Sequence, residues 1–338
     1  MCFFLMAGFY NSFFTNSQPM LSEKLLTMAD LDRDSIDMIL RLTSRMESFK
    51  DGNRLTLAGK IVSMLFFESS TRTRMSFEAA AHRLGASVIG FADPASTRGG
   101  LGESAQDVIR MASAYSDVVV VRHPTLAAAQ FTEGAIATPL INAGDGLNNH
   151  PTQTLLDLYT IQKELGRIDG RHIGIVGGLK HSRAAKSLCF GLAKFNDVTV
   201  HLASPRGFEI DLDIVDFMRT NGVRVRRHEN PKDLLATVDA LYVVRVQRER
   251  FESEAAYAST LDLFRIDRNF LKQARPNLIV LHCLPRTAEL PSTVDDTPHN
   301  KYFAQASNGV AVRMALLAAL LRKDAFETRN CVPFKSIA

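Results

Sequence analysis

The 338-residue sequence contains no tryptophan, only four cysteines and no basic run interleaved with aromatic residues. The cysteines are scattered, without a CxxC pair and without the spacing of a disulfide framework. Neither an HExxH motif nor a Cys/His set with metal-ligand spacing occurs, so we expect no metal and no other cofactor. The net charge of +4 is too balanced for a nucleic-acid surface. The composition is typical of a soluble globular enzyme and leaves room for arginine clusters around a small anionic ligand.

The sequence also lacks a recognisable targeting segment. Its apolar start, Met1–Tyr10, is too short to span a bilayer, carries no basic region and is followed by Asn11 and Asn16. We expect residues 1–20 to form a disordered extension, with a targeting signal as the less favoured alternative. Cysteines without disulfide-like spacing are typical of a reducing compartment, so the sequence predicts a cytoplasmic protein without a membrane partner.

Short apolar runs of strand length alternate with helical stretches along most of the chain. This alternation predicts an α/β fold, with two doubly wound parallel-sheet domains joined by interdomain helices. The first domain is predicted at 21–150, with a C-terminal helix at 308–325 that packs back on it, and the second at 151–307. The predicted strands are Ile61–Phe67, Ser87–Phe91, Asp117–Pro124, Pro139–Asp145, His172–Val176, Val198–Leu202, Ala240–Val244 and Leu278–Leu281.

The stretch from Ser70 to Thr73 lies where the first of these strands should turn into a helix. Backbone N–H groups and the positive end of the helix dipole can hold an anion at such a point. Three hydroxyls and a guanidinium add donors suited to phosphate oxygens. An ordinary helix cap followed by a solvated arginine explains the same local pattern. Ligands of parallel sheets bind beyond the carboxyl ends of strands, and Arg122 falls at another such end.

A glycine-bearing turn is predicted at the end of the strand His172–Val176, where Gly177 and Gly178 follow Gly174 in the strand. Their spacing does not fit G-x-G-x-x-G, and no acidic residue follows at the distance that a dinucleotide site requires. A tight turn from strand to helix is the better interpretation, because glycine adopts the backbone conformations that such turns need.

Five segments, in this order along the chain, carry a resemblance to a known family: Phe66–Arg74, Arg122–Pro124, His150–Gln153, Arg245–Arg250 and His282–Arg286. On these motifs the sequence resembles the aspartate/ornithine carbamoyltransferase superfamily, and within it the aspartate carbamoyltransferase catalytic chains, over nearly all of residues 21–322. The resemblance implies transfer of the carbamoyl group of carbamoyl phosphate to L-aspartate. The products would be N-carbamoyl-L-aspartate and phosphate, in de novo pyrimidine biosynthesis.

The resemblance also implies which residues bind the two substrates. Those for carbamoyl phosphate, in the domain at 21–150 and at the start of the next helix, are Ser70, Thr71, Arg72, Thr73, Arg122, His150 and Gln153. Those for aspartate, in the domain at 151–307, are Arg183, Arg245, Gln247 and Leu284. The catalytic residues would neutralise the leaving phosphate and the charge that develops on the carbonyl oxygen, and they are Arg72, Thr73, Arg122 and His150. No covalent nucleophile is expected, and Cys283 is not assigned that role.

The sequence departs from the family pattern at two places. Cys283 replaces the usual proline, and His-Cys-Leu-Pro is the form seen in ornithine-using relatives. Leu101 stands where the family has a lysine that reaches the neighbouring subunit's active site, and Arg98 is the candidate substitute. Two alternatives therefore stay open. One is a carbamoyltransferase for another amino acceptor, and the other is a catalytically impaired homologue that acts as a scaffold.

The family's shared active site implies a homotrimer, in which the loop of one chain completes the site of the next. Regulatory or pathway-enzyme subunits are further partners that the resemblance allows. The Arg245-Val246-Gln247 segment favours aspartate as the acceptor, since ornithine-using relatives carry an acidic, methionine-containing motif there.

Overall fold

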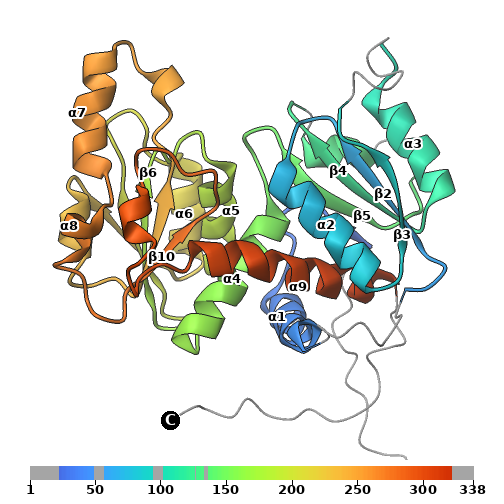
Figure 1. The fold of residues 1–338 in the computed structure, drawn as a ribbon, viewed down its shortest axis with the longest axis horizontal. Helices are drawn as coiled ribbons and strands as arrows, with labels where there is room; N and C mark the ends of the chain where they lie inside the picture. The colour runs from blue at the N-terminus through green and yellow to red at the C-terminus, as the bar shows by residue number, and fades with distance from the viewer. Residues whose placement is uncertain (1–22, 49–56, 94–101, 126, 133–135, 322–338) are drawn as a thin grey trace, which may run out of the picture.

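The protein folds around two parallel β-sheets, as Figure 1 shows for the whole chain. The structure, a computed structural model, describes residues 23–48, 57–93, 102–125, 127–132 and 136–321. The predicted extension at 1–20 lies outside these ranges, as do Arg98 and Leu101. The predicted fold class, two parallel-sheet α/β domains, is confirmed.

The first sheet has five strands in the order β1-β5-β4-β2-β3, and every neighbouring pair is parallel. Its strands are β1 Lys24–Leu25, β2 Ile61–Phe66, β3 Ser87–Phe91, β4 Val118–His123 and β5 Leu140–Asp145. The central strands β2 and β4 are buried almost throughout, because they are covered on both faces. Four strands lie where the apolar runs predict them, whereas the two-residue β1 is too short to leave a pattern.

The second sheet has the order β10-β9-β6-β7-β8 and is also parallel throughout. Its strands are β6 His172–Gly177, β7 Thr199–Ala203, β8 Arg224–His228, β9 Ala240–Val244 and β10 Ile279–His282. The sequence analysis missed β8. This strand lies at the edge of the sheet, so it needs no continuous apolar run, and its Arg-Val-Arg-Arg-His sequence stays largely exposed.

Helices cover both sheets and fill the space between them. They are α1 Arg33–Glu47, α2 Thr71–Arg83, α3 Ala105–Tyr115, α4 Pro151–Leu165, α5 Arg183–Leu192, α6 Leu212–Thr220, α7 Glu254–Phe264, α8 Arg268–Leu271 and α9 Tyr302–Leu321. Helix α4 begins with Pro151 in its first turn and is capped after Leu165 by Gly166, which has a φ of 78°.

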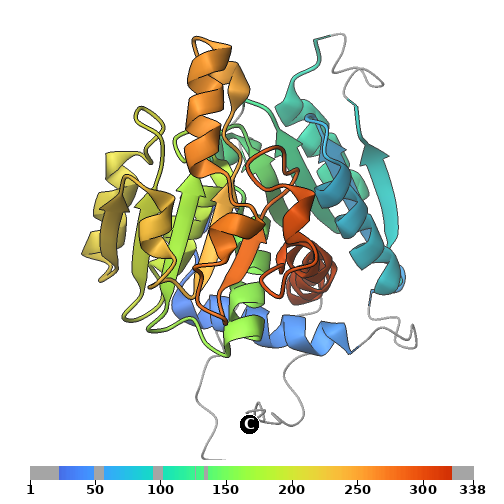
Figure 2. The same ribbon diagram turned by 60° about the vertical axis from the view of Figure 1, so that its left-hand side comes forward.

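Helix α9 joins the two halves of the molecule. It packs against α1, α2 and α4 and contacts β10 (Figure 1), and Figure 2 shows it nearly end-on between the sheets. It has the length and apolar composition of a membrane span, but 67% of that window is buried inside the protein. The helix begins at Tyr302, earlier than the apolar run suggests, because the polar Gln305 and Asn308 are buried and hydrogen-bonded to α4.

Candidate functional site

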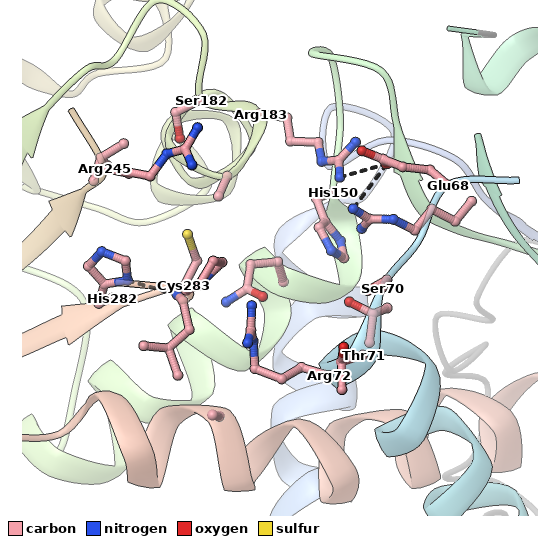
Figure 3. Close-up of a pocket in the computed structure, with 18 of the residues that line it drawn as sticks. Glu68, Ser70, Thr71, Arg72, His150, Ser182, Arg183, Arg245, His282 and Cys283 are labelled. Atoms are coloured by element: carbon pink, nitrogen blue, oxygen red, sulfur yellow. Dashed lines mark hydrogen bonds and ion pairs between the residues drawn. The ribbon is translucent and has the colours of Figure 1, made fainter. Parts of the chain in front are cut away.

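A cavity of about 600 Å³ lies between the two sheets, at the carboxyl ends of their strands. Figure 3 shows that its walls come from both halves of the molecule, with Arg72 on one side and Arg245 on the other. Every predicted site residue in the described part of the chain lines this cavity: Ser70, Thr71, Arg72, Thr73, Arg122, His150, Gln153, Arg183, Arg245, Gln247 and Leu284. The fold therefore brings together residues that are more than a hundred positions apart in sequence.

The N-terminus of α2 forms one end of the cavity. Strand β2 ends at Phe66, and α2 begins at Thr71 with the extended Ser70 in front of it. The Ser70 side chain makes no capping hydrogen bond, and the first turn contains no acidic residue. The first N–H groups of the helix are thus left without an internal acceptor and face a cavity that Arg72 also lines. This arrangement favours an anion site over the helix-cap alternative.

Two arginines from different halves of the molecule meet at Glu68. Nη2 of Arg122, from β4, and Nη2 of Arg183, from the start of α5, each lie 3.0 Å from Oε2 of Glu68 (Figure 3). Gly144, with a φ of 123°, gives them room, since an added Cβ would come within 3.0 Å of the Arg122 Nη1. Burial, and then the charge of Arg183, lower the pKa of Arg122 to about 10, so the Arg122 guanidinium remains cationic at neutral pH.

Glu68 was given no role in the sequence analysis, although it lies in the quoted Phe66–Arg74 motif. Its carboxylate occupies the position between two guanidinium groups where a carboxylate or phosphate ligand would also bind. It also links the loop after β2 to the start of α5 across the cavity. The signal that could have revealed it is a lone acidic residue next to a stretch that otherwise supplies cationic and neutral donors.

His150 is held as a neutral imidazole at the start of α4. Its backbone N–H donates to the Ser187 hydroxyl at 2.8 Å, and its side chain is buried. Burial, followed by the charges of Arg183 and Arg122, holds the pKa of His150 well below its ordinary value. Its Nδ1 has no hydrogen-bond partner among the described residues. A neutral imidazole here can donate one hydrogen bond to a ligand oxygen without carrying charge.

Helix α9 contributes Gln305 and Arg313 to the cavity wall, and the sequence analysis missed both. The guanidinium of Arg313 is buried over the ring of Phe77, 5.0 Å from its centroid, and Nη1 donates to the Gly309 carbonyl at 3.0 Å. Burial lowers the pKa of Arg313 to about 9. The available signal was an arginine within the apolar second half of this helix, because arginine is almost never fully buried unless it has a polar partner.

The other side of the cavity follows β9 and β10. Arg245 comes directly after β9 and pairs with Glu249, and Gln247 follows two residues later. Leu284 has a φ of 55°, and its backbone N–H donates to Nδ1 of His282 at 2.8 Å. These contacts fix the main chain that faces the cavity after β10.

Cys283 lies between His282 and Leu284 in the sequence and also lines the cavity. Burial raises the pKa of its thiol to about 11, so the thiolate is scarce at neutral pH. This agrees with the expectation that the site uses no covalent nucleophile.

The charge of the cavity wall is strongly positive. Its arginines are Arg72, Arg122, Arg183, Arg245 and Arg313, and Glu68 is the only acidic side chain among the described lining residues. No group of His, Cys, Asp and Glu side chains in the described ranges is arranged to hold a metal ion. The wall therefore suits ligands that carry several negative charges between them.

The sequence matches one protein family along most of its length. Residues 23–163 match the domain described as "Aspartate/ornithine carbamoyltransferase, carbamoyl-P binding domain". Residues 169–320 match "Aspartate/ornithine carbamoyltransferase, Asp/Orn binding domain". The aspartate carbamoyltransferase catalytic subunit of Thermococcus onnurineus (strain NA1) is 45% identical over 299 residues, which are 88% of this chain and 96% of that relative.

The solved structures that are similar to this chain belong to the same family. The catalytic subunit of M. jannaschii aspartate transcarbamoylase superposes with a TM-score of 0.84 at 39% identity, over 90% of this chain and 100% of that one. The aspartate transcarbamoylase from Trypanosoma cruzi, in complex with carbamoyl phosphate and aspartate, superposes with a TM-score of 0.82 at 34% identity. That alignment covers 88% of this chain and 95% of the other.

Proposed function

The chain belongs to the aspartate/ornithine carbamoyltransferase family, and we propose that it transfers the carbamoyl group of carbamoyl phosphate to L-aspartate. The observation that carries the proposal is the two-sided arginine cavity. A helix N-terminus with Arg72 lies on one side, and Arg183 and Arg245 lie on the other. This placement suits one phosphorylated substrate and one dicarboxylate that meet in the middle.

The proposed reaction is a direct displacement. The unprotonated α-amine of aspartate attacks the carbamoyl carbon, a C–N bond forms, and the carbonyl oxygen takes up negative charge. The bond between the carbamoyl carbon and the phosphate oxygen then breaks, and phosphate leaves with the electron pair and takes up the proton that the amine loses. Arg122, His150 and Thr73 stabilise the oxyanion, and Arg72 with the N-terminus of α2 stabilises the departing phosphate. None of these steps requires a covalent enzyme intermediate.

The neutral state of His150 fits its proposed role. A cationic imidazole beside Arg122 and Arg183 would be costly to bury, whereas a neutral one still donates an N–H to the developing oxyanion. Arg122 keeps its charge despite burial and supplies the cation. Of the residues proposed to stabilise the transition state, Arg122 is therefore charged and His150 is neutral. The imidazole of His150 stays neutral around pH 7, so its hydrogen bond to the oxyanion does not change with pH in that range.

Aspartate is the acceptor that the charges favour. Arg183 and Arg245 line the wall that follows the second sheet, and both are suited to bind carboxylates with paired N–H groups. A cationic acceptor such as ornithine would place an ammonium group near these arginines and is disfavoured. The name of the Trypanosoma cruzi complex, which contains carbamoyl phosphate and aspartate, supports the same pair of substrates.

Phosphate release by the purified chain tests the function directly. With carbamoyl phosphate and L-aspartate we expect turnover, and with L-ornithine we expect none above the rate without acceptor. Replacing Arg245 with alanine should raise the KM for aspartate by roughly 10- to 100-fold and leave the KM for carbamoyl phosphate within about threefold, because one charge-assisted contact is lost. Release with ornithine but not aspartate would overturn the choice of acceptor, and no release with any amine would overturn the enzymatic function.

We also propose that the active form is a cytoplasmic homotrimer with shared active sites. A shallow cavity of about 280 Å³ between β3 and α3 supports a subunit contact at this surface. Its lining includes exposed apolar side chains of Ile89, Met111 and Tyr115. Glu103, which also lines it, follows the stretch that contains Arg98 and Leu101 and that lies outside the described residues. The relative's name, catalytic subunit, supports an association with further subunits.

Mixing two inactive variants tests the sharing of sites. Arg98→Ala and Arg72→Ala should each abolish most activity as pure oligomers. Unfolding and refolding them together should restore activity to about a quarter of the wild type, since a hybrid trimer places an intact Arg72 opposite an intact Arg98 at some sites. The oligomer mass by light scattering is the control. Full activity of Arg98→Ala alone would remove Arg98 from the site, and a mixture that stays inactive would exclude sharing.

A further inference from the structure

Asp157 is a fully buried carboxylate that the proposed mechanism does not use. It lies on α4, one turn after Gln153, and its Oδ1 accepts two hydrogen bonds from side-chain amides. Nε2 of Gln153 donates to it at 2.9 Å, and Nε2 of Gln305, on α9, donates at 2.6 Å. Both glutamines line the cavity, so one carboxylate beneath the site contacts two groups that face the ligand.

The contact with Asp157 decides which way each amide points. Oδ1 of Asp157 is the acceptor in both contacts, so each glutamine turns its NH₂ group toward Asp157 and its carbonyl oxygen away. Gln305 shows the result, since its Oε1 accepts from the backbone N–H of His282 at 2.8 Å. For Gln153 the oxygen is left for the cavity, because its NH₂ group is engaged by Asp157.

We propose that Asp157 is a positioning residue that makes Gln153 present its carbonyl oxygen to the substrate, so that the site selects an acyl phosphate bearing an N–H donor. On this view the carbamoyl group is preferred over an acetyl group of the same shape, since a methyl group leaves the Gln153 oxygen without a donor. The inference rests on the proposed function and explains how the same site distinguishes its substrate from close analogues.

The same carboxylate also reaches the other wall of the cavity. Gln305 connects it to the backbone of His282, and Nδ1 of His282 accepts from the backbone N–H of Leu284 at 2.8 Å. Nε2 of His282 donates to Glu289 at 3.0 Å, which fixes the tautomer that leaves Nδ1 as an acceptor. A chain of hydrogen bonds therefore runs from Gln153 to Leu284 through Asp157, and it spans α4, α9 and the end of β10.

Asp157 is costly to bury, which argues against a purely stabilising role. Burial raises the pKa of Asp157 to about 7, against the opposing effects of its hydrogen bonds and of Arg313. When folding raises the pKa of a carboxyl group, the free energy of unfolding falls as the pH rises from the ordinary pKa of the group to the raised one. The titratable and charged groups that face it are Arg313 from α9, Tyr242 from β9 and Cys283 from the loop after β10.

Two stable analogues test this selection without turnover. Phosphonoacetamide carries the NH₂ group of the carbamoyl moiety, and acetonylphosphonate has a methyl group in its place. The inhibition constants of the wild type should favour the amide by about tenfold, which corresponds to one neutral hydrogen bond. In Asp157→Ala, or in the similarly sized Asp157→Leu if the alanine variant does not fold, the preference should fall to within about threefold.

Asp157→Asn is the matched control. It keeps an acceptor oxygen for Gln153, so the preference for the amide should be retained, while the charge that is costly to bury is removed. We expect its melting temperature to exceed that of the wild type at pH 8 and to differ less at pH 5. If Asp157→Ala and Asp157→Leu lose stability but keep the full preference, Asp157 is structural only and the inference is wrong. A wild type that binds neither analogue would instead contradict the proposed function itself.

Discussion

Replacing Arg72 with alanine is expected to lower kcat/KM for carbamoyl phosphate by on the order of 10²–10³-fold, which is typical for the loss of one preorganised donor at a developing charge. Arg72 lines the cavity in the first turn of α2, beside N–H groups that face the same space. The guanidinium can donate two parallel hydrogen bonds to phosphate oxygens, and its contribution grows as the bond to the leaving phosphate breaks. The effect should therefore appear in kcat as well as in KM.

Arg72→Lys separates charge from geometry. Lysine keeps the charge but not the paired N–H groups, so the loss should be smaller than with alanine yet still more than about tenfold. Arg41→Ala, an exposed arginine on α1 that does not line the cavity, should stay within about twofold of the wild type. Melting temperatures measured alongside should be similar for all four proteins. Near-wild-type kinetics in Arg72→Ala would mean that phosphate does not bind at the N-terminus of α2.

The sequence predicts those parts of the site that lie in short, contiguous sequence patterns. The apolar run of β2 followed by hydroxyl-rich residues predicts a strand that turns into a helix, and the structure places Ser70 and Thr71 at that junction. The buried strands β4 and β9 leave continuous apolar runs, and their ends carry Arg122 and Arg245. Local periodicity was sufficient to place Ser70–Thr73 and Arg122 at strand ends, because parallel sheets bring the ends of their strands to one edge, whereas the role of Arg245 came from the family resemblance.

The residues that the sequence analysis missed act through contacts that no local pattern records. Asp157 and Gln305 are 148 positions apart in the chain, and only the packing of α9 against α4 brings them within hydrogen-bond distance. Glu68 meets Arg183 across 115 positions. An amphipathic or apolar pattern places a helix in the core, but it does not reveal which buried polar side chain will find a partner there. The residues that hold the site residues in place could therefore be identified only from the structure.

Gly177→Ala is expected to destabilise the protein by about 3–5 kcal/mol, the combined effect of a left-handed backbone and a steric clash. The sequence analysis interpreted the glycines at the end of β6 as a tight turn, and Gly177, the last residue of this strand, has a φ of 123°. The close approach of the neighbouring strand causes most of the expected loss. An added Cβ would lie 2.0 Å from the backbone carbonyl oxygen of Val244, at the end of β9, so β6 and β9 would have to separate. The melting temperature should fall by roughly 5–10 °C.

Gly170→Ala separates the backbone strain from the steric clash. Gly170 has a φ of 74°, but an added Cβ would meet nothing within 4 Å, so the loss should be about 1 kcal/mol. Thermal unfolding of both variants gives the comparison, and equal losses would show that the close approach of β6 to β9 is not a constraint. Because Val244 directly precedes Arg245, a separation of these strands should also displace that guanidinium. Any Gly177→Ala protein that remains folded is therefore expected to show a raised KM for aspartate, while Gly170→Ala keeps the wild-type value.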